Sequence, residues 1–101
     1  MPATTPIVLV TGGSRGIGAA IARKAAQAGY DVAITYVADA AAAEAVVADV
    51  RSAGRRGLAV QADMANEADL ARAFAAVDSG LGRLTAFVNN AGVTGRSSRL
   101  D

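Results

Sequence analysis

Apolar residues in this chain cluster into four short runs, at Ile7–Val10, Val32–Tyr36, Leu58–Val60 and Leu84–Val88. Within each run they occupy consecutive positions, with little alternation between apolar and polar residues. Strands that are buried on both faces, as in a parallel sheet, have this pattern, whereas half-exposed strands alternate. We therefore predict four strands in one parallel sheet.

Alanine-rich segments lie between these runs and have helical spacing. The first is expected over Gly16–Ala28, with Gly29 as its stop. Ile17, Ile21 and Ala25 recur at intervals of four residues in this segment. Because residues four apart share one side of a helix, we expect these three to form its inner face.

Two further helices are each preceded by a residue that is favoured at helix starts. Asp39 is the expected N-cap of a helix over about Ala40–Ala53, and Gly54 marks its end. Its expected inner face is Val46, Val47 and Val50. Asn66 is expected to cap a third helix that Gly80 closes, with Leu70, Phe74 and Val77 on its inner face.

Strands and helices thus alternate along the chain. This order predicts an α/β fold with a doubly wound parallel sheet and helices on both faces. No linker, internal repeat or low-complexity tract divides the sequence. We expect a single domain over residues 1–101.

Composition and charge exclude several classes of function. The net charge of +1 does not favour nucleic acid or a membrane surface as a partner. The chain has no cysteine and no histidine, which removes thiolate nucleophiles and the most common metal ligands, so no metal site is expected. No apolar stretch approaches the length of a membrane span, and the N-terminus lacks the apolar core of a signal peptide. We expect a soluble cytoplasmic protein.

The stretch TGGSRGIG, residues 11–18, holds four glycines directly after the first predicted strand. Its glycine spacing partly matches a Walker A loop, but Ala19 and Ala20 stand where that loop needs lysine and a hydroxyl. An ordinary structural turn is one remaining interpretation. The other is a dinucleotide-binding loop, in which the backbone and the following helix N-terminus hold a pyrophosphate. The strand before the loop and the helix after it favour the second interpretation.

The pattern T-G-x-x-x-G-x-G resembles the short-chain dehydrogenase/reductase family, in particular its compact single-domain members such as 3-oxoacyl-carrier-protein reductases. Arg15 stands where the related epimerase-type branch has its middle glycine, which argues against that branch. The tetrapeptide Asn89–Gly92 (NNAG) follows the fourth predicted strand, as it does in the family. Asp63 follows the third strand, where family members bind adenine through a carboxylate. The strand order expected for this part is 3-2-1-4, a Rossmann-type sheet.

The resemblance also implies which residues bind the cofactor. The glycine loop would hold the pyrophosphate, Asp63 and the Met64 backbone the adenine, and residues 90–92 the ribose side. The NNAG asparagines would in addition tie adjacent strands together. The complete expected set is Gly12, Ser14, Arg15, Gly16, Ile17, Gly18, Tyr36, Asp63, Met64, Asn90, Ala91 and Gly92.

The choice between the two nicotinamide cofactors depends on the end of the second strand. Folds that prefer NAD(H) place an acid about 20 residues beyond the glycines, to hold the ribose hydroxyls. Tyr36 occupies that position here and carries no charge. Arg15 in the loop offers a positive partner for a 2′-phosphate, and in the family a basic residue there goes with NADP(H). Some such members carry a further arginine where this chain has Val37. We predict NADP(H) in preference to NAD(H).

The family's catalytic tyrosine, with a lysine four residues on, has no counterpart in residues 1–101. Ile34 and Ala40 stand four residues after the two tyrosines, Tyr30 and Tyr36. Lys24, the single lysine, reads as a solvent-facing helix residue. The family's catalytic residues all lie downstream of NNAG, so we assign no catalytic residue here.

We therefore expect these residues to be the N-terminal, cofactor-binding part of a longer enzyme. That enzyme would transfer a hydride between NADP(H) and a small carbonyl or alcohol substrate, and the resemblance implies a homo-oligomer, either dimer or tetramer. The apolar fourth strand at the sheet edge supports a longer chain, although a partner could cover it instead. Two alternatives remain: a non-catalytic nucleotide-sensing or interaction module, and a purely structural α/β domain.

Overall fold

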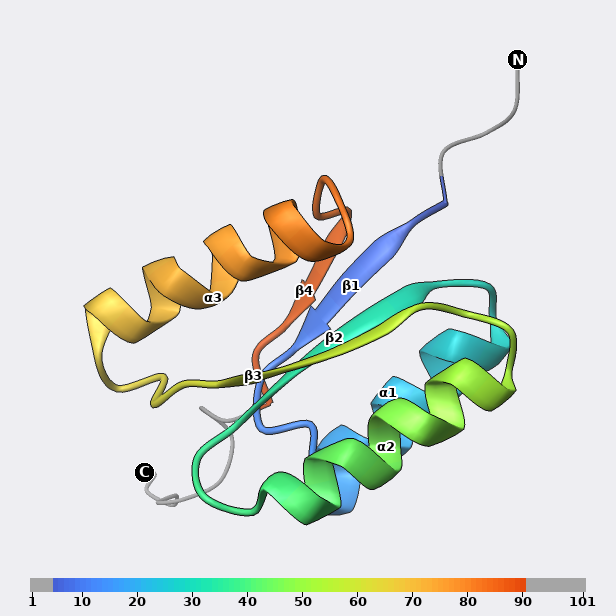
Figure 1. Ribbon diagram of the computed structural model, residues 1–101, viewed down its shortest axis with the longest axis horizontal. Helices are drawn as coiled ribbons and strands as arrows, with labels where there is room; N and C mark the ends of the chain where they lie inside the picture. The colour runs from blue at the N-terminus through green and yellow to red at the C-terminus, as the bar shows by residue number, and fades with distance from the viewer. Residues whose placement is uncertain (1–4, 91–101) are drawn as a thin grey trace.

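The computed structural model describes residues 5–90, and these form alternating strands and helices (Figure 1). The elements are β1 (Ile7–Val10), α1 (Gly16–Gln27), β2 (Asp31–Tyr36), α2 (Ala40–Ser52), β3 (Gly57–Gln61), α3 (Glu67–Gly80) and β4 (Ala86–Val88). Every element predicted from the sequence is present, with ends that shift by one or two residues.

The strands of residues 5–90 form one parallel sheet in the order β3-β2-β1-β4, which confirms the predicted order. Val8 in β1 is paired with Val32 in β2 on one side and with Ala86 in β4 on the other. All strands run in the same direction, so their carboxyl ends meet at one edge of the sheet. The loops that follow β1, β2, β3 and β4 therefore gather along that edge.

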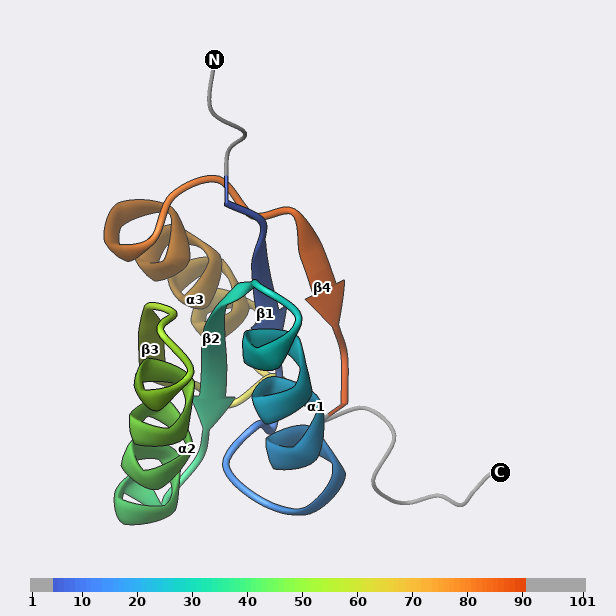
Figure 2. The same cartoon turned by 90° about the vertical axis from the view of Figure 1, so that its right-hand side faces the viewer.

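Helices cover both faces of the sheet, as the strand pattern predicts. The helices α1 and α2 lie side by side on one face, and α3 lies on the other (Figures 1 and 2). Alternate residues of β1 serve the two faces. Val8 and Val10 pack with α1 and α2, whereas Ile7 and Leu9 pack with Val77 of α3. Burial of the strands on both faces explains why their sequences are continuously apolar.

The inner face of α1 differs from the prediction. Gly18, Ala19, Ala22 and Ala26 are the buried residues of this helix, while Ile21 and Ala25 are only partly buried. Ile17 is 70% exposed. In an alanine-rich helix every face is apolar enough to be buried, so the isoleucines do not identify the inner face. Small side chains occupy it because they let the helix approach the sheet and α2 closely.

The ends of α2 and α3 follow the predicted caps. The carboxylate of Asp39 accepts a hydrogen bond from the Ala42 amide at 3.0 Å, and Asn66 Oδ1 accepts one from the Asp69 amide at 3.1 Å. Gly54 has a φ of +84° just beyond α2, as its role as a stop requires. The predicted inner face of α2 is buried, and in α3 Ala73 and Val77 are buried while Phe74 packs partly.

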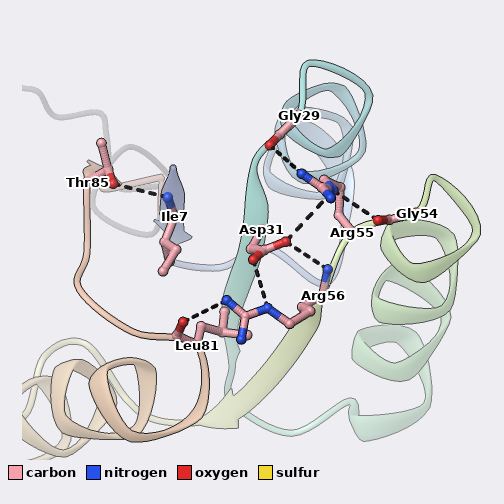
Figure 3. Close-up of polar contacts among 8 residues, drawn as sticks. All are labelled: Ile7, Gly29, Asp31, Gly54, Arg55, Arg56, Leu81 and Thr85. Carbon is pink, nitrogen blue, oxygen red and sulfur yellow. Dashed lines mark hydrogen bonds and ion pairs between the residues drawn. The ribbon is translucent and has the colours of Figure 1, made fainter. Parts of the chain in front are cut away.

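The strand β4 begins two residues later than the sequence predicts. At this end the Ile7 amide donates to the Thr85 hydroxyl at 3.1 Å, and the Thr85 amide donates to the Ile7 carbonyl at 2.8 Å (Figure 3). A side chain therefore replaces one backbone acceptor of the ladder, and regular pairing starts at Ala86.

The amino end of the sheet is held by a buried acid. Asp31, the first residue of β2, accepts hydrogen bonds from the Arg56 amide at 2.9 Å and from Arg56 Nε at 2.8 Å (Figure 3). The Arg56 guanidinium also donates to the Leu81 carbonyl at 2.8 Å, and Arg55 donates to the Gly29 carbonyl at 3.0 Å. This cluster joins the start of β2 to β3 and to the end of α3, at the opposite end of the sheet from the glycine loop.

Candidate functional site

A cleft of about 1040 Å³ opens along the carboxyl edge of the sheet. Its walls are the glycine loop and the start of α1, the end of β2 with the loop to α2, the loop after β3, and Asn89 and Asn90 after β4. Ligands of open α/β sheets bind at this edge, where neighbouring loops separate to opposite faces. The sheet therefore brings together segments that are up to about 80 residues apart in sequence.

The glycine loop is tied to the neighbouring strand by backbone and hydroxyl contacts. The Gly12 amide donates to the Thr35 hydroxyl at 3.0 Å, and the Gly13 amide donates to the Thr35 carbonyl at 3.1 Å. Gly12 has a φ of +64°, which confirms the sharp turn expected there. The loop is consequently held in one position relative to β2.

The remaining glycines differ in what their missing side chains allow. A Cβ on Gly18 would collide with the Gly12 carbonyl and lie 2.7 Å from Asn90 Nδ2. Gly18 thus lets the helix pack against its own loop. Gly16 has a φ of +58°, and its missing Cβ would point into open space. Gly16 is therefore required by its backbone conformation, and it leaves the cleft wall open.

The start of α1 presents uncompensated positive charge to the cleft. Arg15 occupies the N-cap position with extended backbone, and neither a side-chain cap nor an acid in the first turn is present. The first amides of the helix, at Gly16, Ile17 and Gly18, thus point outward without a side-chain acceptor, and the helix dipole adds to their effect. The exposed Arg15 and Ile17 side chains flank them, and within residues 5–90 Arg15 has no side-chain partner. This arrangement suits an anion such as a phosphate.

The end of β2 lacks a free carboxylate. Tyr36 and Val37 form the wall there, and Val37 is 65% exposed. The nearest acid along this wall, Asp39, uses its carboxylate to cap α2, as the sequence predicts. The wall next to Arg15 therefore offers apolar surface and an aromatic ring.

The loop after β3 places Asp63 and Met64 in the cleft wall. Asp63 Oδ1 accepts a hydrogen bond from the Ala65 amide at 2.9 Å, and the Asp63 amide donates to Asp69 Oδ2 at 2.8 Å. Because Asn66 is the N-cap of α3, Asp63 is not needed for that role. Its carboxylate is exposed and remains available to a ligand.

The two asparagines after β4 hold the glycine loop from the other side. The Thr11 hydroxyl donates to Asn89 Oδ1 at 3.0 Å, and Asn90 Nδ2 donates to the Gly12 carbonyl at 3.2 Å. These bonds tie the ends of β1 and β4 together, which confirms the structural role expected of the tetrapeptide. Ala91 and Gly92, also expected to bind the cofactor, lie outside the described residues.

The structure adds residues that the sequence analysis did not select. Thr11 and Thr35 are 0% and 1% exposed, and both hold the glycine loop by side-chain hydrogen bonds. The sequence could have indicated these two residues, because each places a hydroxyl near the end of a buried strand and buried polar groups need hydrogen-bond partners. Val37, Ala38 and Ala62 also line the cleft, but nothing in their sequence context distinguishes them from other loop and strand residues.

These features fit a dinucleotide phosphate group. A glycine with positive φ leaves space beside uncapped helix amides, and next to them lies Arg15, whose side chain has no partner in the part of the chain that the structure describes. The cleft volume of about 1040 Å³ is at the upper end of the range for small-molecule and cofactor sites.

A family model described as short chain dehydrogenase matches residues 6–101. The chain belongs to the short-chain dehydrogenase family. This confirms the family resemblance drawn from the TGGSRGIG and NNAG motifs. The family is one of oxidoreductases.

Relatives of this chain agree with the family match. The 3-oxoacyl-acyl-carrier-protein reductase FabG of Staphylococcus aureus is 42% identical over 90 residues, which are 89% of this chain and 37% of the reductase. A solved short chain dehydrogenase from Burkholderia cenocepacia, in complex with NADP, is 50% identical with a TM-score of 0.81. The match covers 83% of this chain and 34% of that one.

A third relative is a blue fluorescent protein from a metagenomic library, solved in complex with NADPH. It is 44% identical, with a TM-score of 0.81, over 84% of this chain and 35% of that chain. The chain thus spans about a third of the length of these relatives. Within residues 5–90, none of the helices is both long and apolar enough to cross a membrane.

Proposed function

We propose that this chain forms the NADP(H)-binding part of a short-chain dehydrogenase that acts on a carbonyl or alcohol substrate. One observation carries the cofactor choice: Arg15 lies free at the cleft beside a strand end, Tyr36, that has no carboxylate. A 2′-phosphate would find a positive partner there and no repelling acid. The complexes of two relatives with NADP and NADPH support the same choice.

Each wall of the cleft has a role in this proposal. The amides at the start of α1, with Ser14 and Gly12 in the loop, bind the pyrophosphate. Arg15 binds the 2′-phosphate against Tyr36. The Asp63 carboxylate and the Met64 backbone bind the adenine, while Asn90 and the residues after it border the ribose on the nicotinamide side.

The bound nicotinamide supplies the hydride acceptor or donor of the reaction. This chain's own residues bind and orient the cofactor, and residues 1–101 hold no tyrosine with a lysine four positions on for the proton transfer. A cytoplasmic location and a homo-oligomeric state stay predictions.

A comparison of cofactor affinities tests the proposal. Wild-type full-length protein is titrated with NADPH and NADH, and NADPH is expected to bind more tightly. Arg15→Ala is expected to weaken NADPH about 10- to 100-fold, the effect of losing a charge-assisted hydrogen bond, and to leave NADH nearly unchanged. Lys24→Ala is the control, because it removes an exposed positive charge on the same helix away from the cleft. Tighter binding of NADH by the wild-type protein would contradict the proposal.

A further inference from the structure

Arg72 lies on α3, outside the cleft, and contacts two separate groups. Its Nη2 donates to the Gln61 carbonyl at 2.6 Å and lies 3.4 Å from Asp69 Oδ1 one turn earlier in the helix. The Arg72 side chain is 55% exposed. An exposed ion pair of this kind contributes little to folding by itself. The functional interest of Arg72 depends on what its two partners hold.

The contact with Asp69 leads to the loop after β3, which forms the proposed adenine wall of the cleft. Asp69 Oδ2, the other oxygen of the carboxylate that Arg72 contacts, accepts the hydrogen bond from the Asp63 amide at 2.8 Å. The bond from the Asp63 amide lowers the pKa of Asp69, partial burial opposes this, and Arg72 lowers the pKa further. The carboxylate therefore remains charged at neutral pH and keeps its hold on the loop after β3.

The contact with Gln61 leads to the neighbouring wall, formed by the loop after β2. Gln61 is the last residue of β3, and its side-chain Nε2 donates to the Val37 carbonyl at 2.9 Å. Val37 belongs to the loop between β2 and α2, which lines the same cleft as Arg15 and borders the proposed 2′-phosphate position. Arg72 thus binds the backbone carbonyl of Gln61, and the Gln61 side chain binds the loop between β2 and α2.

We propose that Arg72 is a positioning residue for the adenosine half of the cleft, because one guanidinium is linked to Asp63 by its ion pair with Asp69 and to Val37 by its hydrogen bond to Gln61. This inference rests on the proposed binding of NADP(H). The Ala62 amide donates to the Tyr36 carbonyl at 2.9 Å, which joins the two loops where they leave the sheet. Beyond that point, the bonds made by Asp69 and Gln61 hold the loop residues and help to fix the separation of the two walls. A ligand that fills the space between them binds most tightly when that separation is fixed beforehand.

The test uses ligands that occupy one half of the cleft. Affinities of the full-length protein for NADPH, for 2′,5′-ADP and for reduced nicotinamide mononucleotide are measured by titration. Arg72→Ala is expected to weaken NADPH and 2′,5′-ADP by the same factor, about three- to tenfold, as the loss of supporting hydrogen bonds predicts. The affinity for reduced nicotinamide mononucleotide is expected to stay unchanged, which a general loosening of the fold would not allow.

Two further variants complete the design. Arg23→Ala breaks an exposed ion pair with Asp49, 2.6 Å long, that touches no cleft residue, and is expected to leave all affinities unchanged. Gln61→Ala removes only the bond to Val37 and is expected to weaken 2′,5′-ADP by less than Arg72→Ala does. It also tests the inference if Arg72→Ala does not fold.

The possible failures are distinguishable. If the wild-type protein does not bind NADPH, the proposed function is wrong and the inference is overturned with it. If the wild-type protein binds NADPH, but Arg72→Ala or Gln61→Ala matches Arg23→Ala, the role of Arg72 alone is overturned. An equal loss for both halves of the cofactor also overturns it.

Discussion

The carboxylate of Asp31 accepts a hydrogen bond from Arg56 Nε at 2.8 Å, although only 3% of Asp31 is exposed to solvent. The same carboxylate accepts the Arg56 backbone amide at 2.9 Å, so one arginine satisfies it twice (Figure 3). A buried charge is tolerated only when it is paired and hydrogen-bonded in this way. The pair fixes the amino end of β2 against β3, far from the cleft.

Replacing Asp31 by asparagine is expected to destabilise the domain by about 2 kcal/mol, because bonds to a charged, buried acceptor are lost. The exposure of the Arg56 side chain, 59%, keeps the loss below that of a fully buried pair. Urea unfolding measures the change. Asp49→Asn, which breaks the exposed pair with Arg23, is expected to cost less than about 1 kcal/mol. If Asp31→Asn and Asp49→Asn lowered the free energy of unfolding equally, the larger contribution expected of the buried carboxylate would be refuted.

Stability at acid pH is expected to depend on Asp31. Burial by itself raises the pKa of this carboxyl, but the hydrogen bonds and charges of Arg56 and Arg55 outweigh it and lower the pKa below the ordinary 3.8. The folded state therefore binds fewer protons than the unfolded state around that pH. The contribution is complete at neutral pH and is lost as pH falls below 3.8 and through the folded pKa. Unfolding free energies from pH 7 to pH 3 should fall less steeply for Asp31→Asn than for Asp49→Asn.

Thr35→Val is expected to loosen the glycine loop. Valine keeps the shape of threonine but removes the hydroxyl that accepts the Gly12 amide at 3.0 Å, leaving a part-buried donor without its acceptor. A loss of about 1–3 kcal/mol in stability, together with weaker NADPH binding, is expected from this unpaired donor. Thr35→Ser retains the hydroxyl and serves as the control. If valine and serine gave the same NADPH affinity, the hydroxyl would have no role in holding the loop.

Gly18→Ala is expected to displace the loop, since the new Cβ would collide with the Gly12 carbonyl, which is backbone and cannot rotate away. Forcing a methyl group into such a site costs about 1–3 kcal/mol. Gly80→Ala tests the same change in α3, where the nearest atom is the end of the flexible Leu58 side chain at 3.3 Å. The free energy of unfolding of Gly80→Ala should stay within about 1 kcal/mol of the wild-type value, because alanine has a higher helix propensity than glycine. Thermal unfolding and NADPH titration compare the two.

Much of the fold follows from local patterns in the sequence. Consecutive apolar residues in β1 and β2 indicate burial on both faces, and Asp39 and Asn66 mark the helix starts because a cap acts on amides within three residues of itself. The inner face of α1 does not follow, because alanine on all sides gives no amphipathic pattern. Ile17, the largest apolar residue at its start, is exposed at the cleft instead.

The candidate site divides in the same way. Gly12 and Gly16 are recognisable from sequence because their order and spacing within one loop carry the signal, and their positive φ values agree with a turn that only glycine adopts readily. Thr35 and Arg72 are not recognisable, since their partners lie on other elements. The pairing of β1 with β2 places Thr35 beside Gly12, and the turn from β3 into α3 places Arg72 beside Gln61. The roles of the proposed cofactor residues remain predictions for the titrations above.

The amino-acid sequence by itself determined the alternation of strands and helices, the glycine turn, the helix caps and the family, because each of these depends on residue types at short, fixed spacings. Only the tertiary structure decided that Gly18 makes room for its own loop, that Asp31 is buried under Arg56, and that Arg72 is linked to both walls of the cleft. The parallel pairing of β2 with β3 brings Arg56 to Asp31, 25 residues away in the chain. The other contacts join residues closer in sequence, whose separation in space depends on how the glycine loop turns into α1 and how the loop after β3 turns into α3.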